Sequence, residues 1–377
     1  MKKRFERRLT DRIMLFPGVD GDKLAKLVAK RLGMQLSPVK FVRFQGATRM
    51  GGETKPEILC NVMHHDCVVI WSPTNTNDEL MQVCQLINAL KRQGEARHVT
   101  LVVSCFPNAR QDKSHARREP ITAKLTAKIL ETAGMDKIVY LDIHAEQIEG
   151  FFDKAVVRGL WMDAIWVDFL RKKLATLLKH LGLKNNQVRN VPPDEGAVST
   201  NYRIAKLLGS QLAIHLKKRD WTQKHSVTSM GIKGSVVKCL VYDRDDLLAS
   251  GDSLFAAASA AKRKGAKYVI ALVTHAIGFN KKGAKDFAQK LLESDIDELI
   301  VTNSLTHFCD RVRKDPRLQE KVTIIDISPY IATVIDRFKF SVGETVRDMM
   351  REVKPEDLYE VCFISQQARK VEESVKK

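Results

Sequence analysis

The stretch from Ser104 to Asp153, SCFPNARQDKSHARREPITAKLTAKILETAGMDKIVYLDIHAEQIEGFFD, decides the fold. It begins at the end of a β-branched run, passes through a basic loop from Lys113 to Arg118, and continues as a helix opened by Pro120. It then forms a second strand that ends at Leu141, directly before Asp142-Ile143-His144. Open α/β sheets bind their ligands at the carboxyl ends of neighbouring strands. The order of these segments therefore predicts an α/β sheet that binds an anion together with a metal ion.

The same alternation continues on both sides of this stretch. Strands are expected at 12–16, 68–71, 99–103, 138–141, 187–191, 211–215, 239–242, 268–273, 298–302 and 322–326. Helical patterns fall between them, at 21–32, 76–93, 121–133, 162–181, 200–208, 253–264 and 282–292. This alternation is typical of mainly parallel sheets flanked by crossover helices. Because it recurs in both halves, we expect two similar α/β lobes.

Composition suggests where these lobes begin and end. We expect a first lobe at 1–155 and a second lobe at 156–345. Within the second lobe, residues 217–238 have few periodic apolar positions and are expected to form a projecting flap or hairpin. Residues 346–377 are expected to form a helical tail, because Pro355-Glu356-Asp357-Leu358 is a typical helix start.

Charge and cysteine content limit the class of protein. The 63 Lys and Arg residues exceed the 45 Asp and Glu residues and give a net charge of +18, which favours anionic partners such as nucleotides, sugar phosphates or nucleic acid. The 7 cysteines are odd in number and scattered, so the sequence indicates neither a disulfide framework nor a zinc cluster. The apolar runs are too short to span a membrane. We therefore expect a soluble, cytoplasmic protein.

The basic loop is the first candidate site. It places the permanent cations Arg110, Lys113, Arg117 and Arg118 within nine residues, beside Gln111 and Asp112. A guanidinium group binds phosphate oxygens bidentately, so the loop favours a polyphosphate over a single carboxylate. A solvated basic loop without a ligand is the alternative.

Two strand ends carry candidate metal ligands. Asp142 and His144 follow the first strand end, and Asp194 follows the second, in Val191-Pro192-Pro193-Asp194-Glu195-Gly196. Carboxylates beside an imidazole suit a divalent metal, although a lone histidine at such a place is more often structural. We expect both strand ends to face one cleft and to hold Mg²⁺ with its nucleotide.

Lys217, Lys218 and Arg219 follow the expected strand at 211–215, at the root of the flap. Cations there suit a mobile arm that closes on a transferring phosphate, whose transition state needs positive charge more than a nucleophilic side chain. The alternative is a charged hairpin edge that discourages aggregation.

A last candidate site leads from a strand into an Ala-rich helix. Asp243 and Asp246 can hydrogen-bond sugar hydroxyls, and the turn Ser250-Gly251-Asp252-Ser253 can hold phosphate at the helix N-terminus. Ser253 is also suited to cap the helix.

Three motifs carry a resemblance to a known family: Ala109-Arg110-Gln111-Asp112, Arg118-Glu119-Pro120-Ile121-Thr122-Ala123-Lys124-Leu125, and Asp142-Ile143-His144-Ala145-Glu146-Gln147-Ile148-Glu149-Gly150-Phe151-Phe152-Asp153. They closely resemble ribose-phosphate diphosphokinase, also called phosphoribosyl pyrophosphate synthetase, and the similarity extends from about Ile13 to Val342. The resemblance implies two phosphoribosyltransferase-like lobes. It also implies transfer of the intact β,γ-diphosphate of Mg-ATP to the anomeric hydroxyl of ribose 5-phosphate, with release of AMP.

Roles for individual residues follow from the resemblance. It implies that Mg²⁺ is held by His144 and Asp194, and that the transferring diphosphate is stabilised by the flap cations Lys217 and Arg219 together with His144. It implies ATP contacts from Phe44, Arg110, Gln111, Asp112 and Arg118, and acceptor contacts from Asp243, Asp246, Ser250, Gly251, Asp252 and Ser253. Phe44 is similar to the aromatic residue that stacks on adenine from a neighbouring subunit, which implies dimers that assemble into hexamers.

The chain departs from the family at two places. Gln45-Gly46-Ala47-Thr48 stands where the family usually has Ser-Asp-Gly-Glu, so the adenine contacts are in question. In the acceptor loop, Tyr242 replaces the first Asp of Asp-Asp-x-x-Asp-Thr-Gly-Gly-Thr, and Asp252 enters the phosphate turn after about three extra residues. A carboxylate about 4 Å from a phosphate repels it by about 1 kcal/mol even in water.

Three hypotheses fit these departures. The enzyme still uses ribose 5-phosphate with Asp252 turned outward, or it uses a ribose with a larger 5′ group such as ADP-ribose, or it is a non-catalytic regulatory subunit of such an assembly. The second is slightly favoured over the first, and the retained His144, Asp194 and Lys217 disfavour the third. A nucleic-acid-binding role is disfavoured, because the sequence has no aromatic-interleaved basic stripe.

Overall fold

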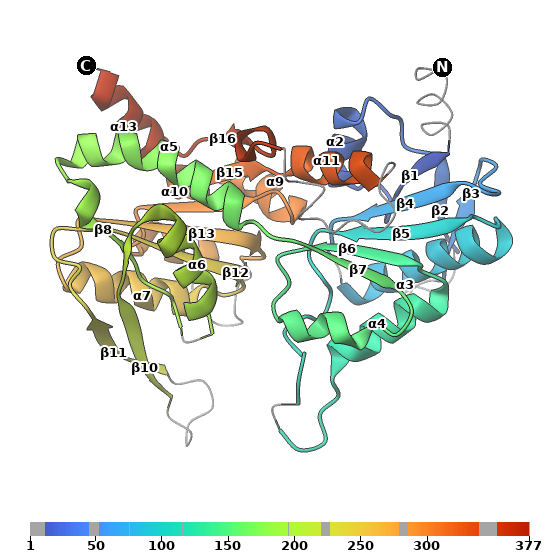
Figure 1. The fold of residues 1–377 in the computed structure, drawn as a ribbon, viewed down its shortest axis with the longest axis horizontal. Coiled ribbons are helices and arrows are strands. Elements are labelled where there is room, and N and C mark those ends of the chain that lie inside the picture. Colours follow the sequence, from blue (N-terminus) through green and yellow to red (C-terminus); the bar gives the residue numbers. More distant parts are fainter. Residues whose placement is uncertain are drawn as a thin grey trace. The chain divides into compact units, whose positions relative to one another are not determined.

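The computed structural model describes residues 12–44, 53–74, 76–114, 116–194, 196–219, 227–278, 286–338 and 353–376. The chain divides into two compact units (Figure 1). Unit 1 comprises Met1–Trp161, Ser304–Thr306 and Ser328–Lys354, and unit 2 comprises Met162–Asn303, His307–Ile327 and Pro355–Lys377. Each unit is an α/β structure built on its own mainly parallel sheet, as the sequence predicts.

Unit 1 is built on a five-stranded parallel sheet in the order β1-β4-β5-β6-β7. Its strands are β1 (Ile13–Pro17), β4 (Asp66–Trp71), β5 (His98–Val103), β6 (Lys137–Leu141) and β7 (Val156–Leu160). The central strands are almost continuously apolar because helices cover both faces of a parallel sheet. All carboxyl ends therefore lie at one edge, where the loops after β5 and β6 begin.

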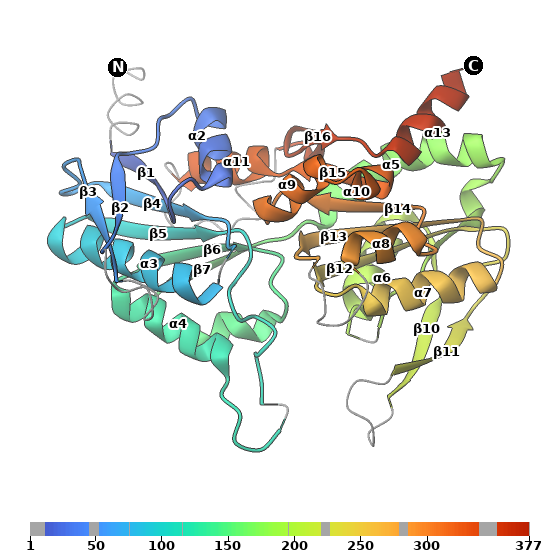
Figure 2. The ribbon, with the colours of Figure 1, turned by 180° about the vertical axis from the view of Figure 1, so that it is seen from behind.

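The helices of unit 1 lie on both faces of this sheet (Figures 1 and 2). One face carries α2 (Lys23–Arg31) and α11 (Ser328–Phe338), which pack against each other. The other carries α3 (Thr76–Asn88), its π-helical continuation η1 (Ala89–Gln93), and α4 (Thr122–Ala133). An antiparallel hairpin of β2 (Val39–Arg43) and β3 (Thr54–Ile58) and a 3₁₀ helix, η2 (Glu146–Phe151), complete the unit.

Unit 2 is built on a seven-stranded sheet in the order β16-β15-β14-β13-β12-β8-β9. Its parallel strands are β8 (Val188–Asn190), β9 (Gln211–Leu212), β12 (Leu240–Leu248), β13 (Tyr268–Ala276), β14 (Glu298–Thr302) and β15 (Val322–Asp326). Only β16 (Glu360–Phe363) runs antiparallel, at the edge. All nine residues of β13 are buried, as expected for the centre of such a sheet.

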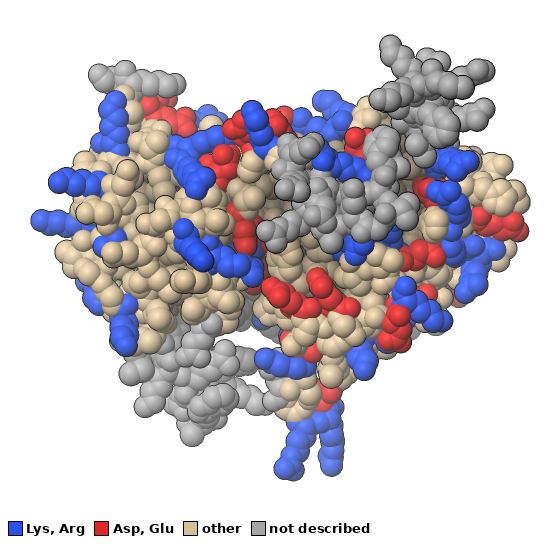
Figure 3. All heavy atoms as spheres, in the orientation of Figure 1, with Lys and Arg blue, Asp and Glu red and all other residues tan. Residues whose placement is uncertain are grey.

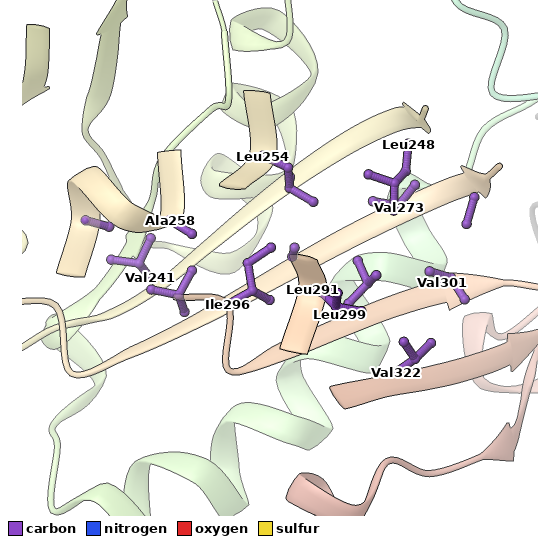
Figure 4. Packing of buried hydrophobic residues seen from close by; sticks show 14 of the residues in the cluster. Val241, Leu248, Leu254, Ala258, Val273, Leu291, Ile296, Leu299, Val301 and Val322 are labelled. Atoms are coloured by element: carbon purple, nitrogen blue, oxygen red, sulfur yellow. The ribbon is translucent and has the colours of Figure 1, made fainter. Parts of the chain in front are cut away.

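One face of the unit 2 sheet packs on α7 (Asp252–Arg263), α8 (Phe287–Glu293), α9 (Thr306–Lys314) and α10 (Pro316–Lys321). Figure 4 shows this core, in which Leu254 and Ala258 of α7 lie close to Val241 and Val273 of the sheet. The remaining helical segments are α5 (Asp163–Leu181), η3 (Asn185–Gln187), α6 (Val198–Leu208), η4 (Pro355–Asp357) and α13 (Gln366–Lys376). An antiparallel hairpin of β10 (Ile214–Arg219) and β11 (Val227–Lys233) projects from the unit (Figure 1).

The unit boundaries differ from the expected ones for identifiable reasons. Residues 156–160 belong to unit 1 because β7 pairs with β6, and α11 joins unit 1 because it packs on α2. The expected helical tail contains one 3₁₀ turn, the edge strand β16 and only then a helix, α13. Tyr359 fastens this segment to α5, since its hydroxyl donates a 2.8 Å hydrogen bond to Asp168.

Two smaller differences affect the site. The expected strand at 211–215 is divided, because β9 ends at Leu212 and β10 begins at Ile214, so Lys217 and Arg219 lie within a hairpin strand and not after a strand. The expected strand at 239–242 continues to Leu248, and every residue of β12 except Asp246 pairs with β13. None of the helices that the structure describes is long and apolar enough to cross a membrane.

Candidate functional site

The loop after β5 is held at both ends by hydrogen bonds. Near its start, the Asn108 side-chain amide donates to the Thr126 hydroxyl at 3.0 Å, and the Asn108 carbonyl accepts from the Gln111 backbone N–H at 3.0 Å. Gln111 then joins the loop to the first turn of α4, because its side chain accepts from the Thr122 hydroxyl at 2.7 Å and its carbonyl accepts from the Ala123 N–H at 3.1 Å. The loop is therefore fixed on the helix that follows it.

The cations of this loop point into solvent. Arg110, Lys113, Arg117 and Arg118 are all exposed, and no carboxylate among the described residues lies within ion-pair distance of them. Figure 3 shows Lys and Arg side chains projecting from the tip of the loop. Four exposed cations on an anchored loop form a surface that suits a polyphosphate.

Gln147 links this loop to the segment that carries His144. Its side-chain amide donates to the carboxylate of Asp112, which is buried. Asp142, also buried, follows β6 with a φ of 37°, a backbone conformation that non-glycine residues rarely adopt, and the chain then turns to expose His144. The structure thus brings Asp112 and the His144 segment together through Gln147, a contact that no pattern in the sequence predicted.

Phe44 directly follows β2, in the connection from β2 to β3, and its side chain is exposed. Its ring is 47% exposed, and the Lys55 ammonium lies 5.6 Å from the ring centroid. An exposed aromatic ring on a short hairpin is free to stack on a flat ligand. The departure at Gln45-Gly46-Ala47-Thr48 lies outside the described residues.

Asp194 in unit 2 holds the start of α6. Its Oδ1 accepts from the backbone N–H of Ala197 at 3.1 Å, and a Cβ at Gly196 would lie 3.4 Å from the same oxygen. The glycine therefore leaves room beside the carboxylate. Glu195 lies outside the described residues.

Carboxylates cluster where β12 passes the end of β8. Asp243 is 2% exposed, and Asp245 and Asp246 follow it, half-buried. Burial, and after it the charge of Asp246, raises the pKa of Asp245 well above its usual range; Asp194 contributes in the same direction. Asp194 and Asp245 are thus close enough to repel each other. The sequence reading singled out Asp243 and Asp246 but missed Asp245.

Asn201 connects these two acidic segments and was also missed. This side chain of α6 is completely buried and hydrogen-bonds both backbone groups of Arg244. A polar residue in an amphipathic helix gives no sequence signal of a partner 43 residues away.

The expected phosphate turn lies at the start of α7. Gly251 has a φ of +80°, is buried, and is the N-cap of the helix, so Ser253 is a helical residue and not the cap. Asp252 is the first residue of the helix; its side chain is 51% exposed and lies 3.8 Å from the Lys290 ammonium. The added carboxylate is thus turned outward, toward a cation. Ser250 and Ser253 flank it in the same turn.

Lys217 and Arg219 lie on β10, opposite Ser229 and Val227 of β11. The register of the hairpin shifts between Leu216 and Lys217, and such an irregularity bends a strand locally. The side chains of both cations lie outside the described part of the structure, so their targets stay a prediction.

The donors in unit 2 fit a magnesium ion. No group of three or more His, Cys, Asp or Glu side chains among the described residues has the arrangement of a complete metal site. Mg²⁺ does not need one, because it is usually held by one or two carboxylates together with water and substrate phosphates. Asp194 and the β12 acids supply such carboxylates, and their mutual repulsion is what a cation would relieve.

Known proteins match this chain over most of its length. Residues 13–134 match the model of the N-terminal domain of ribose phosphate pyrophosphokinase, and residues 186–351 match that of the phosphoribosyl synthetase-associated domain. Ribose-phosphate pyrophosphokinase 2 of Schizosaccharomyces pombe is 34% identical over 89% of this chain and 96% of its own length. The Nitrosomonas europaea ribose-phosphate pyrophosphokinase is 35% identical over 78% of this chain and 86% of its own. The crystal structure of phosphoribosylpyrophosphate synthetase from Mycobacterium smegmatis covers 86% of this chain and 98% of its own, with 30% identity and a TM-score of 0.72.

Proposed function

The chain belongs to the ribose-phosphate pyrophosphokinase family of transferases, and from this premise we propose that it transfers the β,γ-diphosphate of ATP to the anomeric hydroxyl of a 5′-phosphorylated ribose. The observation that carries the proposal is the anchored cationic loop of unit 1, with its exposed cations and its link through Gln147 to the His144 segment. Hydrogen bonds of Asn108 and Gln111 with α4 hold the base of this loop, so its exposed cations project from an anchored segment.

The proposed reaction conserves all atoms of its reactants. The oxygen on C1 of the ribose attacks the β-phosphorus of ATP, and the bond from that phosphorus to the α,β-bridging oxygen breaks. AMP leaves with the bridging oxygen, and the hydroxyl proton is released to solvent. Such a displacement needs alignment and charge neutralisation more than a protein nucleophile.

The chain offers a role for each predicted group. Arg110, Gln111, Asp112 and Arg118 bind or position the polyphosphate, and the exposed ring of Phe44 stacks on the base. The β10 cations Lys217 and Arg219 neutralise the transferring diphosphate. His144 and Asp194 would hold Mg²⁺, which would supply neutralisation of phosphate charge. If Phe44 serves a neighbouring copy, as the family resemblance implies, the enzyme works as a dimer-based oligomer.

Asp243 and Asp246 bind the hydroxyls of the acceptor, and the turn Ser250-Gly251-Asp252-Ser253 receives its 5′ side. The buried N-cap Gly251 presents the backbone N–H groups of the first turn of α7, which attract phosphate. The outward position of Asp252, beside Lys290, keeps ribose 5-phosphate acceptable as the acceptor. Retention of these groups together argues against a purely regulatory subunit.

A ribose with a larger 5′ group, such as ADP-ribose, is the second candidate acceptor. The observation in its favour is the changed segment that receives the 5′ side of the acceptor. There β12 extends to Leu248, and the carboxylate of Asp252 lies on the first turn of α7. An acid at a helix N-terminus competes with a terminal phosphate dianion for the same positive end of the helix dipole. A 5′-diphosphate ester would place its charge farther from that turn.

The test is to incubate the protein with Mg-ATP and one acceptor at a time, either ribose 5-phosphate or ADP-ribose, and to identify the products by mass. A pyrophosphorylated ribose product formed in step with AMP supports the proposal, and the preferred acceptor decides between the two candidates. If AMP forms from neither acceptor, diphosphoryl transfer to these sugars is wrong.

A further inference from the structure

Asn201 lies beside β12 at the point where the neighbouring strand β8 ends. The strand β8 pairs with β12 only as far as Asn190, opposite Tyr242, and the last backbone bond runs from the Val191 N–H to the Tyr242 carbonyl at 2.9 Å. Beyond Tyr242, the next residue of β12 whose backbone N–H and C=O point to the side of β8 is Arg244, where β8 no longer pairs. Arg244 is only 5% exposed, so water cannot easily replace the lost partner.

The side-chain amide of Asn201 takes the place of the missing strand. Its Oδ1 accepts from the Arg244 N–H at 2.9 Å, and its Nδ2 donates to the Arg244 carbonyl at 2.7 Å. The same amide also accepts from the Asn190 side chain at 2.8 Å and donates to the Ala197 carbonyl at 2.8 Å. With 0% exposure, Asn201 uses its whole hydrogen-bonding capacity inside the protein.

These bonds join the two acidic segments of unit 2. On one side, Ala197 is held by Asp194, whose Oδ1 accepts from the Ala197 N–H. On the other side, Arg244 lies between Asp243 and Asp245 in β12. Beyond the backbone bond between Val191 and Tyr242, the Asn201 amide therefore joins the Asp194 turn directly to the part of β12 that carries the acids. Repulsion between the carboxylates of the two segments favours their separation, and the hydrogen bonds of the Asn201 side chain oppose that separation.

We infer that Asn201 is a positioning residue, which touches neither metal nor sugar but sets the spacing between Asp194 and the carboxylates of Asp243 and Asp246. The inference rests on the proposed function of these acids. In this role Asn201 governs the affinity of unit 2 for a divalent cation and for the ribose acceptor. It leaves the contacts of ATP with the cationic loop of unit 1 unchanged.

The substitutions Asn201→Ala and Asn201→Asp test this role. Alanine removes all four bonds, whereas aspartate keeps the shape but turns carboxylate oxygens toward the Arg244 and Ala197 carbonyls, which are acceptors. We expect the KM for ribose 5-phosphate, or for whichever acceptor the wild type uses, to rise about tenfold or more in both variants, as is usual when a buried polar network is broken. The KM for ATP should stay within about twofold of the wild-type value, since the loop of unit 1 is untouched.

A matched control separates positioning from general loss of stability. Ile204 lies on the same helix and is also completely buried, but its side chain is apolar. The substitution Ile204→Ala should lower the thermal midpoint by at least as much as Asn201→Ala, because it leaves a cavity. It should leave the acceptor KM near the wild-type value. An equal rise of the acceptor KM in both variants would show that Asn201 is merely structural.

A second measurement does not depend on turnover. Mn²⁺ and ribose 5-phosphate are titrated calorimetrically into wild type, Asn201→Ala and Ile204→Ala without ATP, and exchange of the Arg244 amide hydrogen is followed. We expect weaker Mn²⁺ binding and faster Arg244 exchange in Asn201→Ala alone. Unchanged Mn²⁺ binding, with Arg244 exchange increased, overturns the inference even if the enzyme is active. Loss of Mn²⁺ binding in a protein that makes no pyrophosphorylated ribose supports the inference and rejects only the proposed reaction.

Discussion

The two regions at the strand ends hold their charges in opposite ways. In unit 1 the charges are cations, which stand exposed on a loop whose polar uncharged residues fasten it to α4. In unit 2 they are carboxylates, buried or half-buried around a buried amide. An exposed cation can adapt to many anions, whereas a buried carboxylate is useful only at a fixed position. We therefore expect the cationic loop of unit 1 to bind and neutralise polyphosphate, and the carboxylates of unit 2 to contribute selectivity.

The largest expected effect comes from a cation outside both regions, Lys217 on the hairpin of unit 2. We expect Lys217→Ala to reduce AMP release by about 1000-fold or more, the usual effect of deleting a cation that stabilises a transferring phosphoryl group. We expect His144→Ala in unit 1 to abolish AMP release as well. Lys218→Ala is the matched control, because it removes the same charge from the adjacent position of β10. Wild-type turnover in Lys217→Ala, measured as AMP formed, would contradict the assignment.

The next test concerns a buried carboxylate of unit 1. Asp22 accepts from the N–H groups of Ala25 and Ser72, at 3.0 and 2.8 Å, and burial raises its pKa to about 6. The pKa of Asp22 in the folded protein exceeds the ordinary value of 3.8, so the folded protein binds the proton more tightly than the unfolded chain does. Protonation of Asp22 therefore stabilises the folded state. The stabilisation is fully present below about pH 4 and is lost as the pH rises through about 6, a change of about 3 kcal/mol.

This pH dependence can be measured as the thermal midpoint of wild type between pH 4 and 7, with Asp22→Asn as the comparison. The amide does not titrate, so the variant should lack the decline, although it is less stable overall because one of the two N–H groups loses its acceptor. A decline of equal size in both proteins would assign the effect to another group.

A pair of substitutions tests the proposed division of labour directly. Arg110→Ala should raise the KM for ATP about 10- to 100-fold, the usual loss for a charge-assisted hydrogen bond, and leave the acceptor KM unchanged. Asp243→Asn should raise the KM for the acceptor and leave the KM for ATP unchanged. Each variant serves as the control for the other, in the same steady-state assay. If both variants alter both constants equally, the two regions do not act separately.

The smallest expected effect is at Asp252. Asp252→Asn should raise kcat/KM for ribose 5-phosphate relative to ADP-ribose by no more than about fivefold, because a half-exposed charge near a phosphate costs about 1 kcal/mol. Asp295→Asn, in the exposed turn before β14, is the control for a change in net charge. An unchanged preference in Asp252→Asn would remove the argument from repulsion.

What the sequence could predict differs between the two regions for a physical reason. The α/β alternation and the cationic loop of unit 1 are local features, written in β-branched runs and in neighbouring residues such as Arg117 and Arg118. Asn201 depends on a partner 43 residues away, and Asp245 matters because of the surroundings that bury it. Long-range contacts of this kind leave no periodic pattern. For the same reason, the pairing of β16 with β15 and of β7 with β6 was missed.

The edge strand β16 has a practical consequence. It covers the open side of β15, while Val371 and Ala368 of α13 are buried against the unit. Trimming the chain at about residue 354 would uncover both an unpaired strand and the apolar side of α5, a combination that promotes self-association. Shortened versions should therefore precipitate during purification, and affinity tags belong at the amino terminus.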